Sequence, residues 1–164
     1  MAAFGLGLLG SFAFAETARF SGGAEVTLPP NFASASEDGG KTLVVFPKDA
    51  RTFELRLTFH SLVPHLKEHP KAAEEFIAKR ASDQKLELVR IPGTNYVGYI
   101  QYGAPKMEAN GVRTRSLHTD FAIPQGILVS TLTLPTDKMT DPAVKAFLRG
   151  PMEKILASVR YSGS

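Results

Sequence analysis

Hydrophobic and polar side chains alternate along several short stretches of the chain, and Gly, Pro or Asn closes most of these stretches. The alternation is cleanest from Phe53 to Phe59, where an apolar side chain occupies every second position. Because successive side chains of a strand point to opposite faces, this pattern predicts a half-buried strand. Similar patterns predict strands at residues 20–28, 42–46, 86–91, 96–102, 112–123 and 127–134, and a shorter one at 32–36.

Two segments show helical spacing instead. Residues 71–82 place apolar side chains on one face, which predicts an amphipathic helix of about three turns. The apolar face is formed by Ala73, Phe76, Ile77 and Ala81. A second helix is predicted over residues 142–159, with Asp141 as its N-cap, because apolar side chains continue there in one helical stripe. Gly150-Pro151 interrupts the stripe without shifting its phase, so we expect one helix that bends at this point.

The order of these elements predicts the fold class. The chain has 164 residues, about the length of one domain, and no repeat, linker or low-complexity tract follows residue 16. Short turns join most of the strands, among them the strong turn dipeptide Asn110-Gly111, and short turns favour antiparallel pairing. We therefore expect a single α+β domain, in which two main helices pack on a largely antiparallel sheet of about six to seven strands.

The N-terminal residues predict a targeting segment. Residues 2–15 carry no charge, and Ala13-Phe14-Ala15 matches the small-x-small pattern at which secretory signals are cleaved. The stretch is shorter than the roughly 20 apolar residues that span a bilayer. We expect residues 1–15 to be a signal peptide and residues 16–164 to be a mature domain, periplasmic or secreted, with no stable membrane span. Because no Lys or Arg precedes the stretch, a buried N-terminal helix or strand stays open as the alternative.

Composition and charge exclude several classes of site. The chain has no Cys, which excludes disulfides, thiol nucleophiles, iron–sulfur clusters and sulfur-based zinc sites. It carries 19 basic and 16 acidic residues, a net charge of +3 that is too even to indicate nucleic-acid binding. We therefore expect neither a nucleic-acid partner nor a cofactor.

A histidine motif raises the question of metal. Residues 65–69 read H-x-x-E-H, the inverted zinc-protease motif, in which two histidines one helical turn apart bind zinc and the glutamate polarises water. Pro70 disfavours helical geometry at His69, so solvated histidines in a strand-to-helix connection are the simpler interpretation. A zinc hydrolase using His65, Glu68 and His69, or a looser metal site that adds His60, stays open as an alternative, and we expect no metal.

Four side chains are weak candidates for a binding surface. Arg113 and Arg115 share one face of a predicted strand, and Tyr96 and Tyr102 share one face of another. Tyr and Arg are favoured at protein interfaces. The simpler interpretation is a half-exposed sheet face. His118 and Asp120 also share a strand face and could orient a base, but no serine motif accompanies them, so we expect no catalytic residue.

With its elements in this order, the chain resembles the PsbP/DcrB-like family of envelope and accessory proteins over roughly residues 20–161. The stretches that carry the resemblance are Val26–Phe32, Phe53–Phe59 with the following helix, Tyr96–Tyr102, Ile127–Leu134, and Phe147 through the terminal Ser158-Val159-Arg160-Tyr161. Asn31-Phe32 replaces the Gly-Trp frequent at the first of these turns. The resemblance implies an α/β sandwich and a small accessory or binding module without shared catalytic residues.

These observations lead to three hypotheses about function. The first is an exported, non-enzymatic binding protein that contacts a partner protein, for example a toxin-immunity or secretion-accessory protein. The second is a carrier that holds a small molecule or lipid in a pocket between sheet and helix. The third is the metal-dependent hydrolase.

Overall fold

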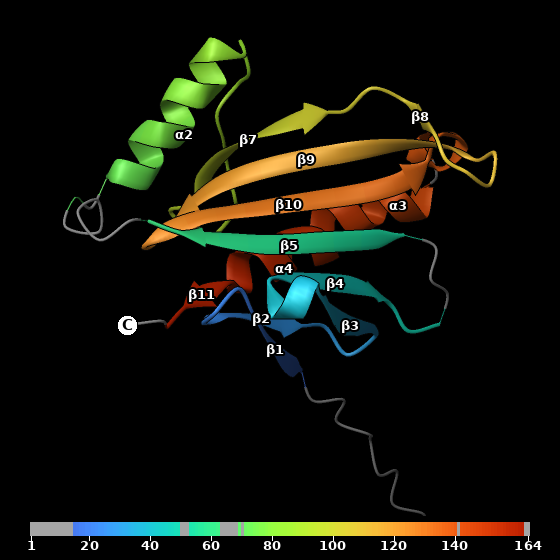
Figure 1. The fold of residues 1–164 in the computed structure, drawn as a ribbon, viewed down its shortest axis with the longest axis horizontal. Helices are drawn as coiled ribbons and strands as arrows, with labels where there is room; N and C mark the ends of the chain where they lie inside the picture. Colours follow the sequence, from blue (N-terminus) through green and yellow to red (C-terminus); the bar gives the residue numbers. More distant parts are fainter. Residues whose placement is uncertain (1–14, 50–52, 63–68, 70, 141, 163–164) are drawn as a thin grey trace, which may run out of the picture.

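The computed structural model describes residues 15–49, 53–62, 69, 71–140 and 142–162, which form two antiparallel sheets and three α-helices (Figure 1). The larger sheet has the order β3-β4-β5-β10-β9-β7-β6, and β8 pairs with β9 beyond the end of β7. Its strands are β3 (Phe32–Glu37), β4 (Thr42–Pro47), β5 (Glu54–Ser61), β6 (Val89–Arg90), β7 (Val97–Tyr102), β8 (Lys106–Met107), β9 (Arg113–Ile123) and β10 (Gly126–Pro135).

A smaller sheet joins the two ends of the described chain. It consists of β1 (Glu16–Phe20), β2 (Ala24–Leu28) and β11 (Arg160–Tyr161) in the order β1-β2-β11. The single strand expected at residues 20–28 is wrong. Three residues in a row, Ser21, Gly22 and Gly23, have positive φ, so the chain reverses there and forms a hairpin.

Ser21 fastens this small sheet to the large one. Its hydroxyl group donates a hydrogen bond to the Lys41 carbonyl and accepts one of 2.9 Å from the Phe59 backbone N–H. The ring of Phe59 also stacks on Tyr161 of β11, with 4.4 Å between ring centroids. The two sheets therefore share one hydrophobic core.

The main core lies between the large sheet and the C-terminal helical run. The inward side chains of β5 and β10, such as Leu55, Leu57, Leu128 and Leu132, are fully buried. They alternate with partly exposed neighbours along both strands; these neighbours are polar in β5, whereas β10 also carries Ile127 and Val129 on that face.

The C-terminal helix is interrupted at the predicted Gly150-Pro151. It consists of α3 (Pro142–Phe147), a π-helical turn (Leu148–Met152) and α4 (Glu153–Ser158). Pro151 has no N–H to donate to the preceding turn, and the wider π turn accommodates it. Phe147, Met152 and Ile155 are buried on both sides of the bend, so the apolar stripe keeps its phase. The predicted N-cap, Asp141, lies outside the described residues.

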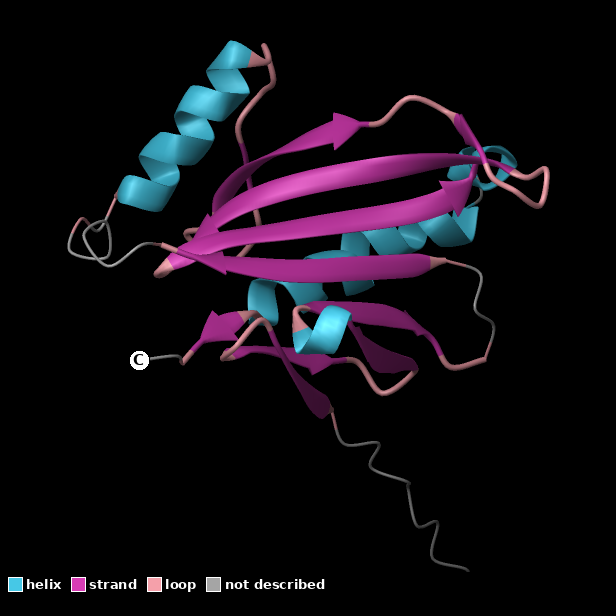
Figure 2. Ribbon diagram, in the orientation of Figure 1, coloured by secondary structure: helices cyan, strands magenta, loops and turns pink. Residues whose placement is uncertain are grey.

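The other face of the large sheet carries α2 (Ala72–Asp83), close to the predicted bounds. Figure 2 shows α2 and the C-terminal helices as separate blocks beside the sheet. Ala73, Ile77 and Ala81 pack against Tyr99 and Ala122 in a second, smaller cluster. Phe76, which the sequence placed on this apolar face, is 49% exposed. That expectation was wrong because only Ala73, Ile77 and Ala81 of α2 pack in the buried cluster on the sheet, and Phe76 lies outside this contact.

The expected fold class, a single α+β domain with a largely antiparallel sheet, is confirmed. The described residues form eleven strands, more than the six to seven expected. The strands that were not expected are β8 and β11, of two residues each, and β1, which forms a hairpin with β2 in place of the single strand 20–28. Within the predicted strand 86–91, only Val89–Arg90 pairs. No helix in the described part of the chain is long and apolar enough to cross a membrane.

Candidate functional site

The four candidate side chains fall into two places. Tyr96 precedes β7 and is only 7% exposed. Its hydroxyl group donates a 2.9 Å hydrogen bond to the Val159 carbonyl and accepts one of 2.7 Å from Arg160. Tyr96 therefore anchors the end of the C-terminal helix, and we leave it out of the binding surface.

The other three candidates, Tyr102, Arg113 and Arg115, lie at the opposite end of β7. Tyr102 ends that strand and is 54% exposed. The guanidinium carbon of Arg115 lies 5.2 Å from the centre of the Tyr102 ring, a cation–π arrangement. The Arg115 Nε donates a 3.0 Å hydrogen bond to the Gly103 carbonyl, which holds the guanidinium group in this position.

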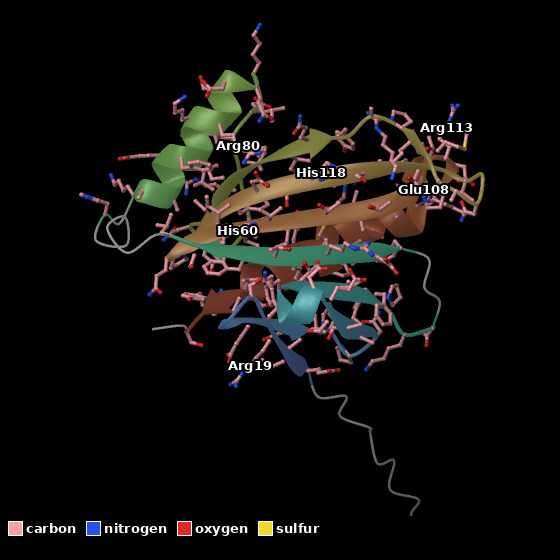
Figure 3. The ribbon with its side chains drawn as sticks, in the orientation of Figure 1. Arg19, His60, Arg80, Glu108, Arg113 and His118 are labelled. Carbon is pink, nitrogen blue, oxygen red and sulfur yellow. The ribbon has the colours of Figure 1, made fainter. Side chains whose placement is uncertain are left out.

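A hairpin extends this surface along the edge of β9. Gly103 pairs with Ser116 through a 2.8 Å backbone hydrogen bond, and β8 then runs beside the start of β9 with Met107 opposite Arg113. The predicted turn at Asn110-Gly111 is present: Gly111 has a φ of 78°, and the Asn110 side chain accepts a 3.0 Å hydrogen bond from the Val112 N–H. Arg113 and Glu108 lie together at this end of the sheet, away from Arg80 on α2 (Figure 3).

We define the hairpin patch as Tyr102, Met107, Arg113 and Arg115. Its aromatic and apolar members are exposed, Tyr102 at 54% and Met107 at 57%. Large exposed apolar side chains that gather at one place, with Arg and Tyr among them, are typical of protein-binding surfaces.

The charge of the patch is positive. Lys106 lies 3.6 Å from Glu108 and neutralises it, while Arg113 has no ion pair within the described residues. Arg115 contacts a ring and a carbonyl group, neither of which carries a charge. Two positive charges therefore remain beside the exposed apolar groups.

Sequence reasoning missed Met107. The segment between Tyr102 and Val112 is rich in turn residues and has no alternating pattern, so it predicts a loop and not a strand. Only the predicted turn at Asn110-Gly111 could have indicated that a short strand precedes it.

His118 and Asp120 share a face of β9 as expected, but they contact different partners. The His118 Nδ1 lies 3.1 Å from the Thr131 hydroxyl group. Asp120 is buried, accepts a hydrogen bond from the Tyr99 hydroxyl group, and lies 3.6 Å from the Arg80 guanidinium group. Burial raises the pKa of Tyr99 well above its ordinary value, and the hydrogen bond to Asp120 raises it further. Asp120 thus stabilises the packing of α2 on the sheet.

The histidine motif falls largely outside the described residues. His65 and Glu68 lie outside them, whereas His60 and His69 lie within. Among the described residues, no group of three or more His, Asp or Glu side chains is arranged to hold a metal ion. The metal hypothesis therefore stays a prediction.

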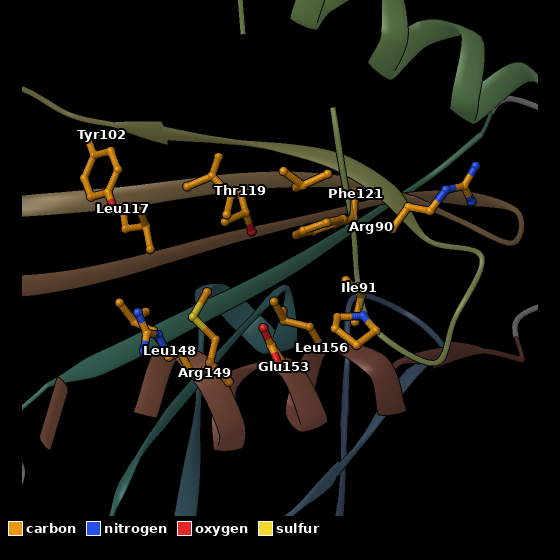
Figure 4. Close-up of a pocket in the computed structure, with 14 residues that line it drawn as sticks. Arg90, Ile91, Tyr102, Leu117, Thr119, Phe121, Leu148, Arg149, Glu153 and Leu156 are labelled. Atoms are coloured by element: carbon orange, nitrogen blue, oxygen red, sulfur yellow. The ribbon is translucent and has the colours of Figure 1, made fainter. Parts of the chain in front are cut away.

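A cavity of about 380 Å³ lies between the large sheet and the π turn, beside the hairpin patch (Figure 4). Ile100, Tyr102, Leu117 and Phe121 line it from the sheet, and Leu148 and Met152 line it from the helical run. The charged side chains of Arg90, Arg149 and Glu153 complete it. The sheet–helix pocket that the carrier hypothesis requires is thus present in the fold.

No protein-family model matches the chain, and no curated protein sequence does. Among solved structures, it is similar to a protein from Bacteroides thetaiotaomicron, with a TM-score of 0.61 and 13% identity. That match covers 86% of this chain and 46% of the other, so this chain spans about half the length of that structure. At such low identity the likeness shows the fold alone.

Two further solved structures are similar over most of their length. One is cyanobacterial PsbP (CyanoP) from Synechocystis sp. PCC 6803, with a TM-score of 0.38, 13% identity, and coverage of 95% of this chain and 98% of that one. The other is the Ran-binding protein Mog1p from Saccharomyces cerevisiae, with a TM-score of 0.46, 9% identity, and coverage of 92% and 97%. These TM-scores carry no argument about function. A PsbP protein is thus among the similar structures, while membership of the PsbP/DcrB-like family stays a prediction.

Proposed function

We propose that this chain is a non-enzymatic binding protein that holds a partner protein at the hairpin patch. The observation that carries the proposal is the arrangement of Tyr102 and Arg115, an exposed ring held under a fixed guanidinium group. A side chain that is already ordered loses little conformational entropy on binding, so it stabilises a complex more than a mobile one does. Aromatic and Arg side chains also dominate the binding energy of many interfaces.

The patch defines the chemistry of the partner. The partner presents acidic side chains to Arg113 and Arg115, and an apolar side chain to Met107. Electrostatic complementarity of this kind accelerates association and rejects partners of the wrong charge. A toxin-immunity or secretion-accessory role fits a small module of this type, and we propose that binding occurs outside the cytoplasm, because residues 1–15 have the pattern of a signal peptide.

Site-specific photo-crosslinking tests the proposal. A photoreactive amino acid in place of Met107 is expected to crosslink one protein in an extract of the cells that make the chain. The same amino acid in place of Phe76 on α2 is the matched control, because the two positions are similarly exposed, at 57% and 49%. Equal yields of the same products from both positions, or no product from position 107, would contradict the proposal.

Charge reversal provides a second test on the identified partner. Arg113→Glu and Tyr102→Ala are each expected to weaken its binding roughly tenfold or more. Lys71→Glu makes the same change of net charge at an exposed position directly before α2, and is expected to leave binding unchanged. If Lys71→Glu weakens binding as much as Arg113→Glu does, the effect is one of overall charge and the patch is not the site.

A further inference from the structure

The cavity between the sheet and the π turn has the build of a small-molecule site. Its volume of about 380 Å³ falls within the range of roughly 300–1,000 Å³ that is usual for ligand pockets. It is open to solvent, since Ile100 points toward the helical run and yet remains 41% exposed. The C-terminal helix therefore covers this part of the sheet incompletely.

The interior of the cavity is apolar and leaves few polar groups for a ligand. Thr119 contributes a hydroxyl group from the centre of the sheet, and this group is hydrogen-bonded to Ser130. Leu117, Phe121 and Met152 surround it with hydrocarbon and sulfur. The apolar part of a ligand could be buried there without depriving the Thr119 hydroxyl group of its hydrogen-bond partner.

The helical side carries the charges. Arg149 and Glu153 lie on the π turn and α4, and Figure 4 shows both on the helical side of the cavity, whereas the Arg90 guanidinium group points away from it. Within the described residues, Arg149 has no ion pair. With the Arg90 guanidinium group turned away, Arg149 is the cation of the lining that can meet an anionic head group.

We propose that the cavity between β7, β9 and the π turn binds a small amphipathic carboxylate, whose apolar chain lies against Leu117, Phe121 and Met152 and whose carboxylate pairs with Arg149. Guanidinium and carboxylate groups form paired, charge-assisted hydrogen bonds. The inference does not rest on the proposed protein partner, because Leu117, Arg149 and Met152 lie outside the hairpin patch.

Calorimetric titration of the full chain with three ligands of equal chain length tests the charge preference. Decanoate, below the concentration at which it forms micelles, is expected to bind at least tenfold more tightly than decanol or decyltrimethylammonium. Arg149→Gln is expected to remove this preference while decanol binding stays unchanged. Equal binding of all three ligands, no binding of decanoate, or an unchanged preference in Arg149→Gln would each overturn the proposal.

Two variants test the location. Ile100→Trp fills the opening of the cavity and is expected to abolish decanoate binding, whereas Leu88→Trp, at a similarly exposed position of 48%, does not line the cavity and should bind normally. Loss of binding in both variants, or in neither, would contradict the placement.

Methyl-labelled methionine separates this proposal from the previous one. Met152 lines the cavity, Met107 belongs to the hairpin patch, and Met139 belongs to neither. Decanoate is expected to shift the NMR signal of Met152 alone, and a partner protein that of Met107. If decanoate shifts Met107 and leaves Met152 unchanged, the cavity is not its site.

Discussion

The hydroxyl group of Tyr99 donates a hydrogen bond to the carboxylate of Asp120, directly across the pairing of β7 and β9. Both side chains are buried, and Arg80 of α2 approaches the same carboxylate to 3.6 Å. One acidic group thus joins two strands and the helix that covers them. The approach from Arg80 is long for an ion pair, so the Tyr99 hydroxyl group is the main partner of Asp120.

Removal of this hydroxyl group is expected to destabilise the domain. Tyr99→Phe keeps the ring but leaves the buried Asp120 carboxylate without its donor, which lowers the free energy of unfolding by about 1–3 kcal/mol. Urea denaturation measures the difference. Tyr102→Phe is the matched control, because the Tyr102 hydroxyl group is on an exposed side chain. Equal stability of the two variants would show that the hydrogen bond contributes nothing.

The same pair predicts a loss of stability in alkaline solution. Because burial and the bond to Asp120 raise the pKa of Tyr99 above the ordinary value of about 10, the folded state holds the phenolic proton more tightly than the unfolded chain does. Its contribution is complete below pH 10 and is lost as the pH rises beyond that value. The free energy of unfolding of the wild type should therefore fall more steeply above pH 10 than that of Tyr99→Phe. Parallel curves would contradict this origin.

Gly98 is expected to be irreplaceable in β7. A Cβ atom at this position would lie 2.3 Å from the Asp120 carbonyl oxygen and 2.4 Å from the Phe121 ring, which is closer than atoms can approach. Gly98→Ala should lower the unfolding free energy by about 1–3 kcal/mol or more, and displace Ile100 and Tyr102 further along the strand. Thermal denaturation measures the loss. In Gly150→Ala the new methyl group meets nothing within 4 Å, so stability should be unchanged or slightly higher.

The exported form is expected to begin at Glu16. N-terminal sequencing of protein recovered from the cell envelope or medium checks this, and a start at any other residue contradicts the cleavage site. Replacement of the small residue before the site, Ala15→Arg, should block cleavage and leave the precursor in the cells. Ala18→Ser, beyond the site, is the control.

The sequence predicted the elements best where one face is fully buried. Residues 54–59 of β5 alternate between partly exposed polar and buried apolar side chains because one face is packed in the core, and the predicted bounds of α2 differ from the observed ones by one residue. The hydrophobic pattern failed to predict the turn between β1 and β2, because that turn depends on the backbone conformation of its residues. The hairpin at Ser21 depends on a positive φ at a residue that is not glycine, which no hydrophobic pattern encodes.

The sequence predicted the strands that carry the candidate side chains but not how exposed each side chain is. Tyr102 is exposed and Tyr96 is buried, although the alternation along the predicted strand placed both on one face. The burial of Tyr96 could not be predicted locally, because it depends on Val159 and Arg160, more than sixty residues away. The sequence predicted a pocket between sheet and helix, but it could not predict the size of the cavity. That size depends on the distance between β7 and the π turn, which both line it.

The pairing of β2 with β11 places Glu25 opposite Arg160, so two strands that lie far apart in the sequence are neighbours in the small sheet. This sheet can be completed only when the segment that carries Arg160 and Tyr161 has returned to β2. Contacts between distant parts of a sequence close a large loop of chain, and the entropy cost of that closure slows folding. The pairing of β2 with β11 is therefore expected to form late in the folding of the domain.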